Sequence, residues 1–157
     1  MTQADKDPWP DADARDPALE NWLCFAIYSA EHAFTQFYRP LLEPLGLTYT
    51  QSLVMTLLWD RDARSVREIG EALHLKSSTL TPLIKRLEEA GLVIRRRDGD
   101  DERVVRVSLT DQGRALRDKA REVPEHVAEA LEMSREELRE TIDRLDHIRA
   151  RLIAATR

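Results

Sequence analysis

Apolar residues recur along most of this chain at steps of three and four, a spacing that places them on one face of an α-helix. The helices predicted from this pattern span residues 16–39, 47–60, 65–75, 76–91, 110–123 and 134–152. Between residues 92 and 109 the period changes to that of β-strands, with two strand-like segments around a polar turn. The pattern therefore predicts a mainly α-helical protein with a small β-hairpin.

The first predicted helix begins at Asp16, whose side chain can cap it, followed by Pro17, which lacks a backbone N–H. Cys24 would then lie two turns inside the helix, where the field of the helix dipole has mostly faded. Pro40 and Pro44 do not fit a continuous helix, so we expect a kink or a break there.

Ser, Thr and Gly residues stand where the later helices are expected to begin and end. The predicted N-terminal caps are Thr48 or Thr50, Ser65 with Glu68, Ser77 or Ser78, and Ser134 with Glu137. Gly91 is expected to terminate the helix over 76–91. In the helix over 47–60, Leu53 and Leu58 are among the residues expected to face inward.

The net charge of −5 argues against nucleic acid as a partner, but the charge is unevenly distributed. Residues 1–20 hold six acidic and two basic residues, whereas residues 61–106 hold eleven basic and nine acidic ones. A basic central segment is compatible with DNA binding, because phosphates respond to the local potential. The acids and prolines of residues 1–17 predict a disordered tail.

Composition narrows the remaining classes of protein. No apolar run reaches the ~18 to 20 residues of a membrane span and no N-terminal signal is present, so we expect a cytoplasmic protein without a membrane partner. One cysteine excludes an internal disulfide. The histidines lie far apart with no ligand spacing, so neither a metal site nor a cofactor is expected; they are His32, His74, His126 and His147.

The order of elements over residues 61–110 is that of a winged helix-turn-helix: helix, tight turn, helix, hairpin. In this motif the second helix enters the major groove of DNA, and the hairpin contacts the backbone or the minor groove. The candidate DNA contacts are Ser77, Ser78, Thr79, Thr81, Pro82, Lys85 and Arg86 on the helix, and Arg95, Arg96, Asp101 and Arg103 on the hairpin. Taken singly, each could equally belong to a solvated charged face.

At the hairpin tip, Asp101 precedes Arg103 by two positions, so its carboxylate could orient the guanidinium toward a narrow minor groove. A calcium loop is the alternative for this acidic turn. The segment is too short for such a loop, and no glutamate follows at the twelfth position.

Cys24 shares a helical stripe with two tyrosines. Tyr28 and Tyr38 follow it by 4 and 14 residues, and at about 100° per residue each lies within roughly 40° of Cys24. The stripe has two interpretations. A free cysteine is often a small buried packing residue, whereas phenol hydroxyls beside it could stabilise a reactive thiolate.

The segment "SVREIGEALHLKSSTLTPLIKRLEEAGLVIRRRDGDDERVVRVSLTDQG" resembles the MarR family of dimeric winged-helix repressors. The segments "LCFAIYSA", "FYRPLLEPLGLTYTQ" and "TLTPLIKRLE" resemble its organic-hydroperoxide-sensing (OhrR) branch. The resemblance extends from about residue 20 to the C-terminus. It implies a winged helix-turn-helix fold, a homodimer, and binding to a pseudo-palindromic operator in double-stranded DNA.

The resemblance also implies a redox site. It assigns Cys24 as the peroxide sensor, with Tyr38 and Tyr49 of the partner subunit hydrogen-bonded to its sulfur and Tyr28 lining the same pocket. Two features depart from the family pattern: Thr50-Gln51-Ser52 replaces Pro-Gln-Tyr, and no second cysteine is present to resolve the oxidised sensor. A one-cysteine sensor is implied, whose recovery depends on small cellular thiols.

These observations predict a repressor that releases its operator when an organic hydroperoxide oxidises Cys24. The expected domains are an acidic tail (1–17), N-terminal helices for dimerisation and sensing (18–60), the DNA-binding domain (61–110) and C-terminal dimerisation helices (111–157). One alternative is a repressor released by a reversibly bound phenolic or carboxylic ligand, with Cys24 structural. A thiol peroxidase is the other, but no base or resolving cysteine accompanies the thiol, so we expect no enzyme.

Overall fold

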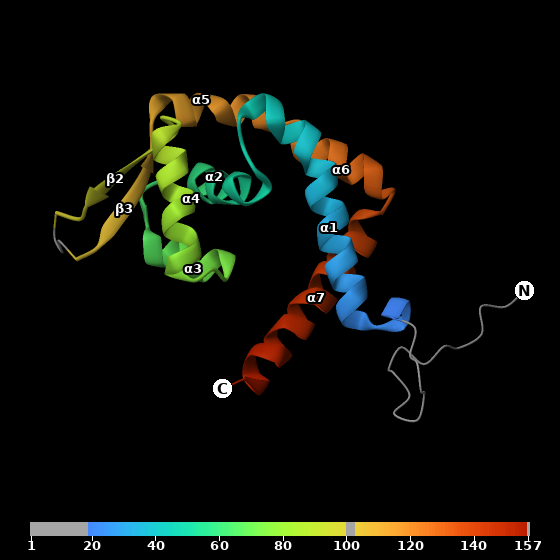
Figure 1. Cartoon of the computed structure of the whole chain (residues 1–157). Helices are drawn as coiled ribbons and strands as arrows, with labels where there is room; N and C mark the ends of the chain where they lie inside the picture. The colour runs from blue at the N-terminus through green and yellow to red at the C-terminus, as the bar shows by residue number, and fades with distance from the viewer. Residues whose placement is uncertain (1–18, 100–102, 157) are drawn as a thin grey trace, which may run out of the picture. The chain divides into compact units, whose positions relative to one another are not determined.

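A computed structural model describes residues 19–99 and 103–156 of the chain (Figure 1). The chain divides into two compact units, one ending at Ala120 and the other beginning at Arg121. The helices of the first unit are α1 (Leu23–Leu42), α2 (Tyr49–Asp60), α3 (Val66–Leu73), α4 (Ser77–Glu89) and α5 (Asp111–Ala120), with short 3-10 turns η1 (Leu19–Asn21) and η2 (Glu43–Leu45). Its strands are β1 (Arg64–Ser65), β2 (Val93–Arg97) and β3 (Val105–Leu109), and the second unit consists of α6 (Val123–Leu131) and α7 (Arg135–Ala155).

Helix α1 differs from its prediction at both ends. It begins at Leu23, because Trp22 is extended (φ −88°, ψ 131°) and separates α1 from η1. The predicted start at Asp16 and Pro17 lies outside the described residues. Cys24 is therefore the second residue of α1 and not two turns inside it. Periodicity could not reveal this, since a single extended residue leaves the apolar positions on either side nearly in phase.

Pro40 lies inside α1 and does not itself end the helix, but the predicted break does come between Pro40 and Pro44. The helix ends two residues later, at Leu42. Pro40 has no backbone N–H, so it removes one hydrogen bond in the last turn, where other backbone groups already lack a partner within the helix. The chain turns at η2, which Pro44 opens and which Gly46 closes in the left-handed region (φ 68°).

The predicted caps of three helices are confirmed, and one is wrong. Thr48, Ser65 and Ser134 each form a capping box, with the third helical residue returning a side-chain bond to the cap N–H. Helix α4 instead begins after Lys76, which makes no side-chain cap. The tight turn from α3 ends at Lys76, whose carbonyl accepts from the N–H groups of Thr79 and Leu80. Ser77 and Ser78 are consequently inside the first turn.

The predicted hairpin is confirmed, and its register places Arg95 opposite Val107 and Arg97 opposite Val105. A short strand, β1, adds to the other edge of β3 and was not predicted from the sequence. Two residues are too few for a period-two pattern. The three-stranded antiparallel sheet has the order β1-β3-β2, and β2 and β3 project from the end of α4 as a wing (Figure 1).

The core of the first unit lies between α2, α3, α4 and the sheet. Its most deeply buried side chains are Val54, Met55, Leu58, Ile69, Leu80, Ile84, Leu87, Val93 and Val107. Leu58 faces inward as expected, whereas Leu53 is 37% exposed, contrary to its prediction. Burial of these aliphatic groups fixes α4 against the sheet and leaves its opposite face in solvent.

In the second unit, α6 was not predicted. The sequence suggested one helix through residue 123, but α5 ends at Ala120 and a new helix begins at Val123, with Pro124 in its first turn. Helix α7 carries exposed aliphatic residues along one side, namely Ile142, Leu145, Leu152 and Ile153. Within the described residues, none of these helices is long and apolar enough to cross a membrane.

Candidate DNA-binding surface and thiol site

Helix α4 presents a polar face to solvent because its apolar residues pack into the core. Leu80, Ile84 and Leu87 are buried, Leu83 and Glu88 are half-buried, and the other residues of the helix are exposed. The exposed residues on this face are Ser77, Ser78, Thr79, Thr81, Pro82, Lys85 and Arg86. The face combines hydroxyl groups, which can donate or accept, with cations that attract phosphate.

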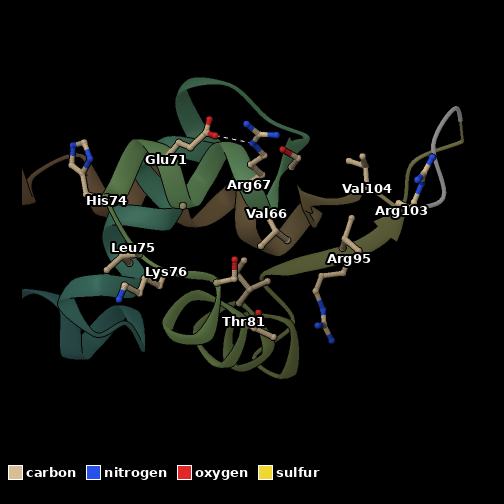
Figure 2. Close-up of a pocket in the computed structure, with 15 residues that line it drawn as sticks. Val66, Arg67, Glu71, His74, Leu75, Lys76, Thr81, Arg95, Arg103 and Val104 are labelled. Atoms are coloured by element: carbon tan, nitrogen blue, oxygen red, sulfur yellow. Dashed lines mark hydrogen bonds and ion pairs between the residues drawn. The ribbon is translucent and has the colours of Figure 1, made fainter. Parts of the chain in front are cut away.

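A cavity of about 1080 Å³ opens between α3, the start of α4 and the wing. Its cationic lining residues are Arg67, Lys76, Arg95 and Arg103, with His74 and Glu71 on the α3 side. Figure 2 shows Arg67 and Glu71 on one side of this cavity and Thr81 on the other. Arg67 is paired with Glu71 at 2.8 Å, so part of the positive charge is already neutralised. The concave shape and the several cationic side chains of its lining suit an extended polyanion.

The wing carries the predicted arginines, and Asp101 lies outside the described residues. Arg95, Arg96 and Arg103 are all exposed. Lys85 on α4 lies 3.7 Å from Glu89. Arg95 is held by Glu88 on α4, a partner that sequence reasoning missed because seven residues and a turn separate the two.

The base of the wing is tied to α3 through Arg106. Its guanidinium donates to Asp98 at 2.5 Å and to the carbonyl oxygen of Ala63 at 3.1 Å, and lies 3.8 Å from Glu68. The Asp98 N–H donates to the Val104 carbonyl at 2.8 Å, which closes the hairpin. Arg106 thus braces the base of the wing.

Cys24 is exposed in the first turn of α1. The N–H groups of a first helical turn have no intrahelical acceptor, and the positive end of the helix dipole favours an anion there. Tyr28, one turn further on, is 64% exposed and stacks on His32 with ring centroids 6.4 Å apart. Because Cys24 is the second residue of α1, the prediction that the dipole field has mostly faded there is wrong.

Tyr38 and Tyr49 lie together, with ring centroids 4.9 Å apart. Burial, followed by the neighbouring Tyr49, raises the pKa of Tyr38, and burial, followed by Glu31, raises the pKa of Tyr49. A phenol is protonated at neutral pH even with its ordinary pKa, so both hydroxyls are available as donors. Within one chain they are distant from Cys24: Tyr38 is 14 residues along the same helix, a rise of about 21 Å.

A second cavity, of about 440 Å³, adjoins Tyr49. Its lining includes Thr35, Gln36 and Arg39 from α1 and Thr48 from the cap of α2. A cavity lined by an arginine and a tyrosine suits a small carboxylate or phenol. Among the described residues, no group of three or more His, Cys, Asp or Glu side chains could hold a metal ion.

Comparison with known proteins agrees with this geometry. Residues 36–120, more than half of the chain, match the family described as transcriptional regulator SarA/Rot. The HTH-type transcriptional regulator TtmR of Methylorubrum extorquens is 48% identical over 140 residues, covering 88% of this chain and 72% of TtmR. The organic hydroperoxide resistance transcriptional regulator of Bacillus subtilis is 43% identical over 122 residues, covering 78% of this chain and 83% of that protein.

Solved structures share the fold. Reduced AbfR of Staphylococcus epidermidis, solved bound to DNA, is 36% identical with a TM-score of 0.73, and the match covers 86% of this chain and 94% of AbfR. The MepR–DNA complex of S. aureus, 23% identical, has a TM-score of 0.74 over 82% of this chain and 96% of MepR.

The fold, the exposed hydroxyl and cationic face of α4, and these relatives define a winged-helix DNA-binding regulator of transcription. The chain belongs to the SarA/Rot and MarR type of winged-helix transcriptional regulators, and it is of the OhrR kind. The resemblance noted in the sequence is thereby confirmed. These relatives are regulators, so the chain falls among DNA-binding proteins and not among enzymes.

Proposed function

We propose that this protein is a homodimeric repressor that releases its operator when an organic hydroperoxide oxidises Cys24. The observation that carries the proposal is the placement of one exposed thiol in the first turn of α1, on the helix that also bears Tyr38. The similarity to the B. subtilis organic hydroperoxide resistance regulator supports it.

A homodimer is supported by apolar surface that a monomer would leave in water. On α1, the exposed large apolar residues are Leu23, Ile27, Tyr28 and Phe37, and α7 carries a second row. Patches of this kind mark protein interfaces, and a two-fold axis lets one surface cover itself. We assign residues 18–60 and 111–157 to dimerisation and residues 61–110 to DNA binding.

A two-fold arrangement also resolves the distance between the thiol and the phenols. Cys24 cannot reach Tyr38 of its own α1 across about 21 Å. If two α1 helices cross in opposite directions, Cys24 of one subunit meets Tyr38 and Tyr49 of the other. Both hydroxyls are available as donors at neutral pH, and hydrogen bonds to the thiolate favour its charged form. Tyr28 would line the same pocket.

The redox step is a two-electron transfer. The Cys24 thiolate attacks the terminal peroxide oxygen, the O–O bond breaks, and the alkoxide leaves and takes a proton from water. Sulfur is oxidised to sulfenic acid and the hydroperoxide is reduced to an alcohol. A small cellular thiol then forms a disulfide with Cys24 and releases water. The larger group no longer fits among the phenols and shifts the dimer toward a state that binds DNA less well.

DNA recognition is assigned to α4 and the wing. Two copies of α4 on one axis would read a pseudo-palindrome with half-sites about one helical turn apart. The candidate contacts are Ser77, Ser78, Thr79, Thr81, Pro82, Lys85, Arg86, Arg96, Asp101 and Arg103. AbfR, solved on DNA in both reduced and overoxidised forms, is a precedent for DNA binding by a regulator of this fold.

A second candidate function follows from the 440 Å³ cavity beside Tyr49. A carboxylate or phenol bound near Arg39 could release DNA without oxidation, leaving Cys24 as a packing residue. Operator binding by the wild type and Cys24→Ser, with and without cumene hydroperoxide, separates the two. We expect the oxidant to release the wild type only, and the wild-type mass to rise by one oxygen or one bound thiol. Equal release of both proteins would refute oxidation of Cys24 as the signal.

A further inference from the structure

We infer that Glu88 and Arg95 form a clamp between α4 and the wing, and that Arg95 serves DNA recognition by fixing the wing in place instead of binding phosphate. The inference rests on the proposed DNA-binding role of α4 and the wing. It changes the role of one predicted contact and adds Glu88, an acidic residue, to the residues that determine recognition.

Glu88 uses both carboxylate oxygens on Arg95. One oxygen accepts from the Arg95 backbone N–H at 3.0 Å. The other accepts from the guanidinium through Nε at 2.8 Å and lies 2.6 Å from Nη2. A carboxylate held by both the main chain and the side chain of β2 constrains the strand itself. The link therefore sets the position of the wing relative to α4.

The side chains of this pair are less exposed than those of the ion pair between Lys85 and Glu89 on α4. The two side chains are 33% and 35% exposed, whereas those of Lys85 and Glu89 are 64% and 62% exposed. Lys85 and Glu89 also lie on the same helix, so their contact joins nothing else. Partial burial reduces screening by salt. Hydrogen bonds from Arg95 lower the pKa of Glu88, which keeps the carboxylate ionised at neutral pH.

The charge of Arg95 is consequently already matched. A phosphate approaching it meets a guanidinium and a carboxylate together, and its binding would release no counterion. Arg96, one residue along β2, makes no ion pair within the described residues and has Arg106 opposite it across the sheet. Figure 2 shows Arg95 beside α4 and Arg103 beyond Val104 toward the wing tip. Arg95 therefore positions the wing, whereas its neighbour Arg96 is the candidate for phosphate binding.

The test measures affinity for two duplexes as a function of salt. The first is an operator selected from randomised duplexes by the wild-type protein, and the second is an unrelated duplex of equal length. Log affinity falls as log salt rises between about 50 and 200 mM salt. Each lost phosphate contact lowers the steepness of this fall, referred to as the slope, by about one. The variants are Arg95→Gln, Arg95→Lys, Glu88→Gln and Arg96→Gln, with Glu89→Gln as the matched control for charge on α4.

We expect Arg96→Gln to lower the slope by about one and to weaken binding to both duplexes. Arg95→Gln should keep the wild-type slope and its affinity for the unrelated duplex, but lose about tenfold in operator affinity. Arg95→Lys should lose operator affinity too, because an ammonium cannot form the two-point contact. Glu88→Gln should lower the preference for the operator, whereas Glu89→Gln should not. The double variant Glu88→Gln, Arg95→Gln should lose no more operator affinity than Arg95→Gln alone.

A slope lowered by one in Arg95→Gln, or full operator affinity in Arg95→Lys, would overturn the inference and return Arg95 to the phosphate contacts. Unchanged preference for the operator in Arg95→Gln would overturn it as well. Melting temperatures equal to wild type confirm that each variant is folded. If the wild type selects no duplex, the DNA-binding function itself fails, an outcome that is distinct from a failure of the clamp alone.

Discussion

The indole Nε1 of Trp59 donates a hydrogen bond of 2.8 Å to the carbonyl oxygen of Gly113, joining the end of α2 to the first turn of α5. Gly113 also lies against the backbone of Leu92, an approach that is possible because Gly113 has no side chain. A Cβ built at that position would lie 2.1 Å from the carbonyl oxygen of Leu92, just before β2. Thr110 completes the junction, since its hydroxyl accepts from the Gly113 N–H at 3.0 Å and donates to the Gly91 carbonyl at 2.6 Å.

Gly113→Ala should therefore destabilise the first unit strongly. The methyl group would force α5 away from the wing base, and overpacking of this kind costs about 1–3 kcal/mol, with the backbone contact placing it at the upper end. Urea unfolding followed by circular dichroism measures the loss. Gly99→Ala is the matched control, because a Cβ there meets nothing within 4 Å. Equal stability of the two variants would contradict the packing described here.

Glu68 makes the stability of the α3 cap depend on pH. Its carboxylate accepts from the Ser65 N–H at 2.7 Å and from the Arg61 guanidinium at 2.6 Å. The bonds from Ser65, followed by that from Arg61, lower its pKa from 4.5 to about 2. Because the folded-state pKa lies below the unfolded one, the stabilisation is complete above pH 4.5 and is lost as the pH falls toward 2.

Glu68→Gln tests this dependence while keeping the capping geometry. The wild type should be more stable than the variant in urea at pH 7, and the difference should shrink steadily below pH 4.5. Other carboxylates titrate in the same window, so the difference between the two proteins is the quantity to follow. A difference that stays constant down to pH 2.5 would contradict the assigned charge interactions.

Tyr38 and Tyr49 provide a test of the thiol pocket. Replacing either phenol by phenylalanine removes one donor from the proposed thiolate site and should slow oxidation of Cys24 by cumene hydroperoxide about tenfold. The measurement is the rate of thiol loss under excess peroxide. In urea, where no pocket exists, the variants should react at the wild-type rate. Unchanged rates in the folded variants would remove the phenols from the mechanism.

Local signals in the sequence predicted local structure well. Ser65 and Glu68 stand three residues apart before an apolar run, and this arrangement alone defines a capping box. The two β-rich segments on either side of a polar turn likewise predicted the hairpin, whose strands are β2 and β3. In both cases the partners are close in sequence, so short-range geometry determines the outcome.

Features that depend on tertiary contacts were not predictable. The Glu88–Arg95 contact connects a helix to a strand, and either residue alone resembles a solvated surface charge. The isolated extended residue Trp22, which moves Cys24 into the first turn of α1, leaves no trace in the apolar period. The candidate DNA contacts on α4 could be predicted because the apolar period shows which side of the helix is buried and which is exposed. The side chains that they contact could not, because these depend on how the elements pack.

The apolar side of α7 supplies the last prediction. Ile142 and Leu145 are 50% and 47% exposed and lie three residues apart on the same side of the helix. If this side forms the dimer interface, carboxylates there would be buried without partners, at a cost of several kcal/mol each. Ile142→Asp combined with Leu145→Asp should therefore give a monomer in sedimentation velocity.

The same variant should lose operator affinity far more than affinity for a single half-site, because two copies of α4 then no longer bind as a unit. Arg144→Asp combined with His147→Asp places two carboxylates on the opposite side of α7 and should remain dimeric. The control also adds more negative charge than the test variant, so a loss of DNA binding in both would indicate repulsion from phosphate. Dimerisation of the Ile142→Asp, Leu145→Asp protein would exclude this side of α7 as the interface.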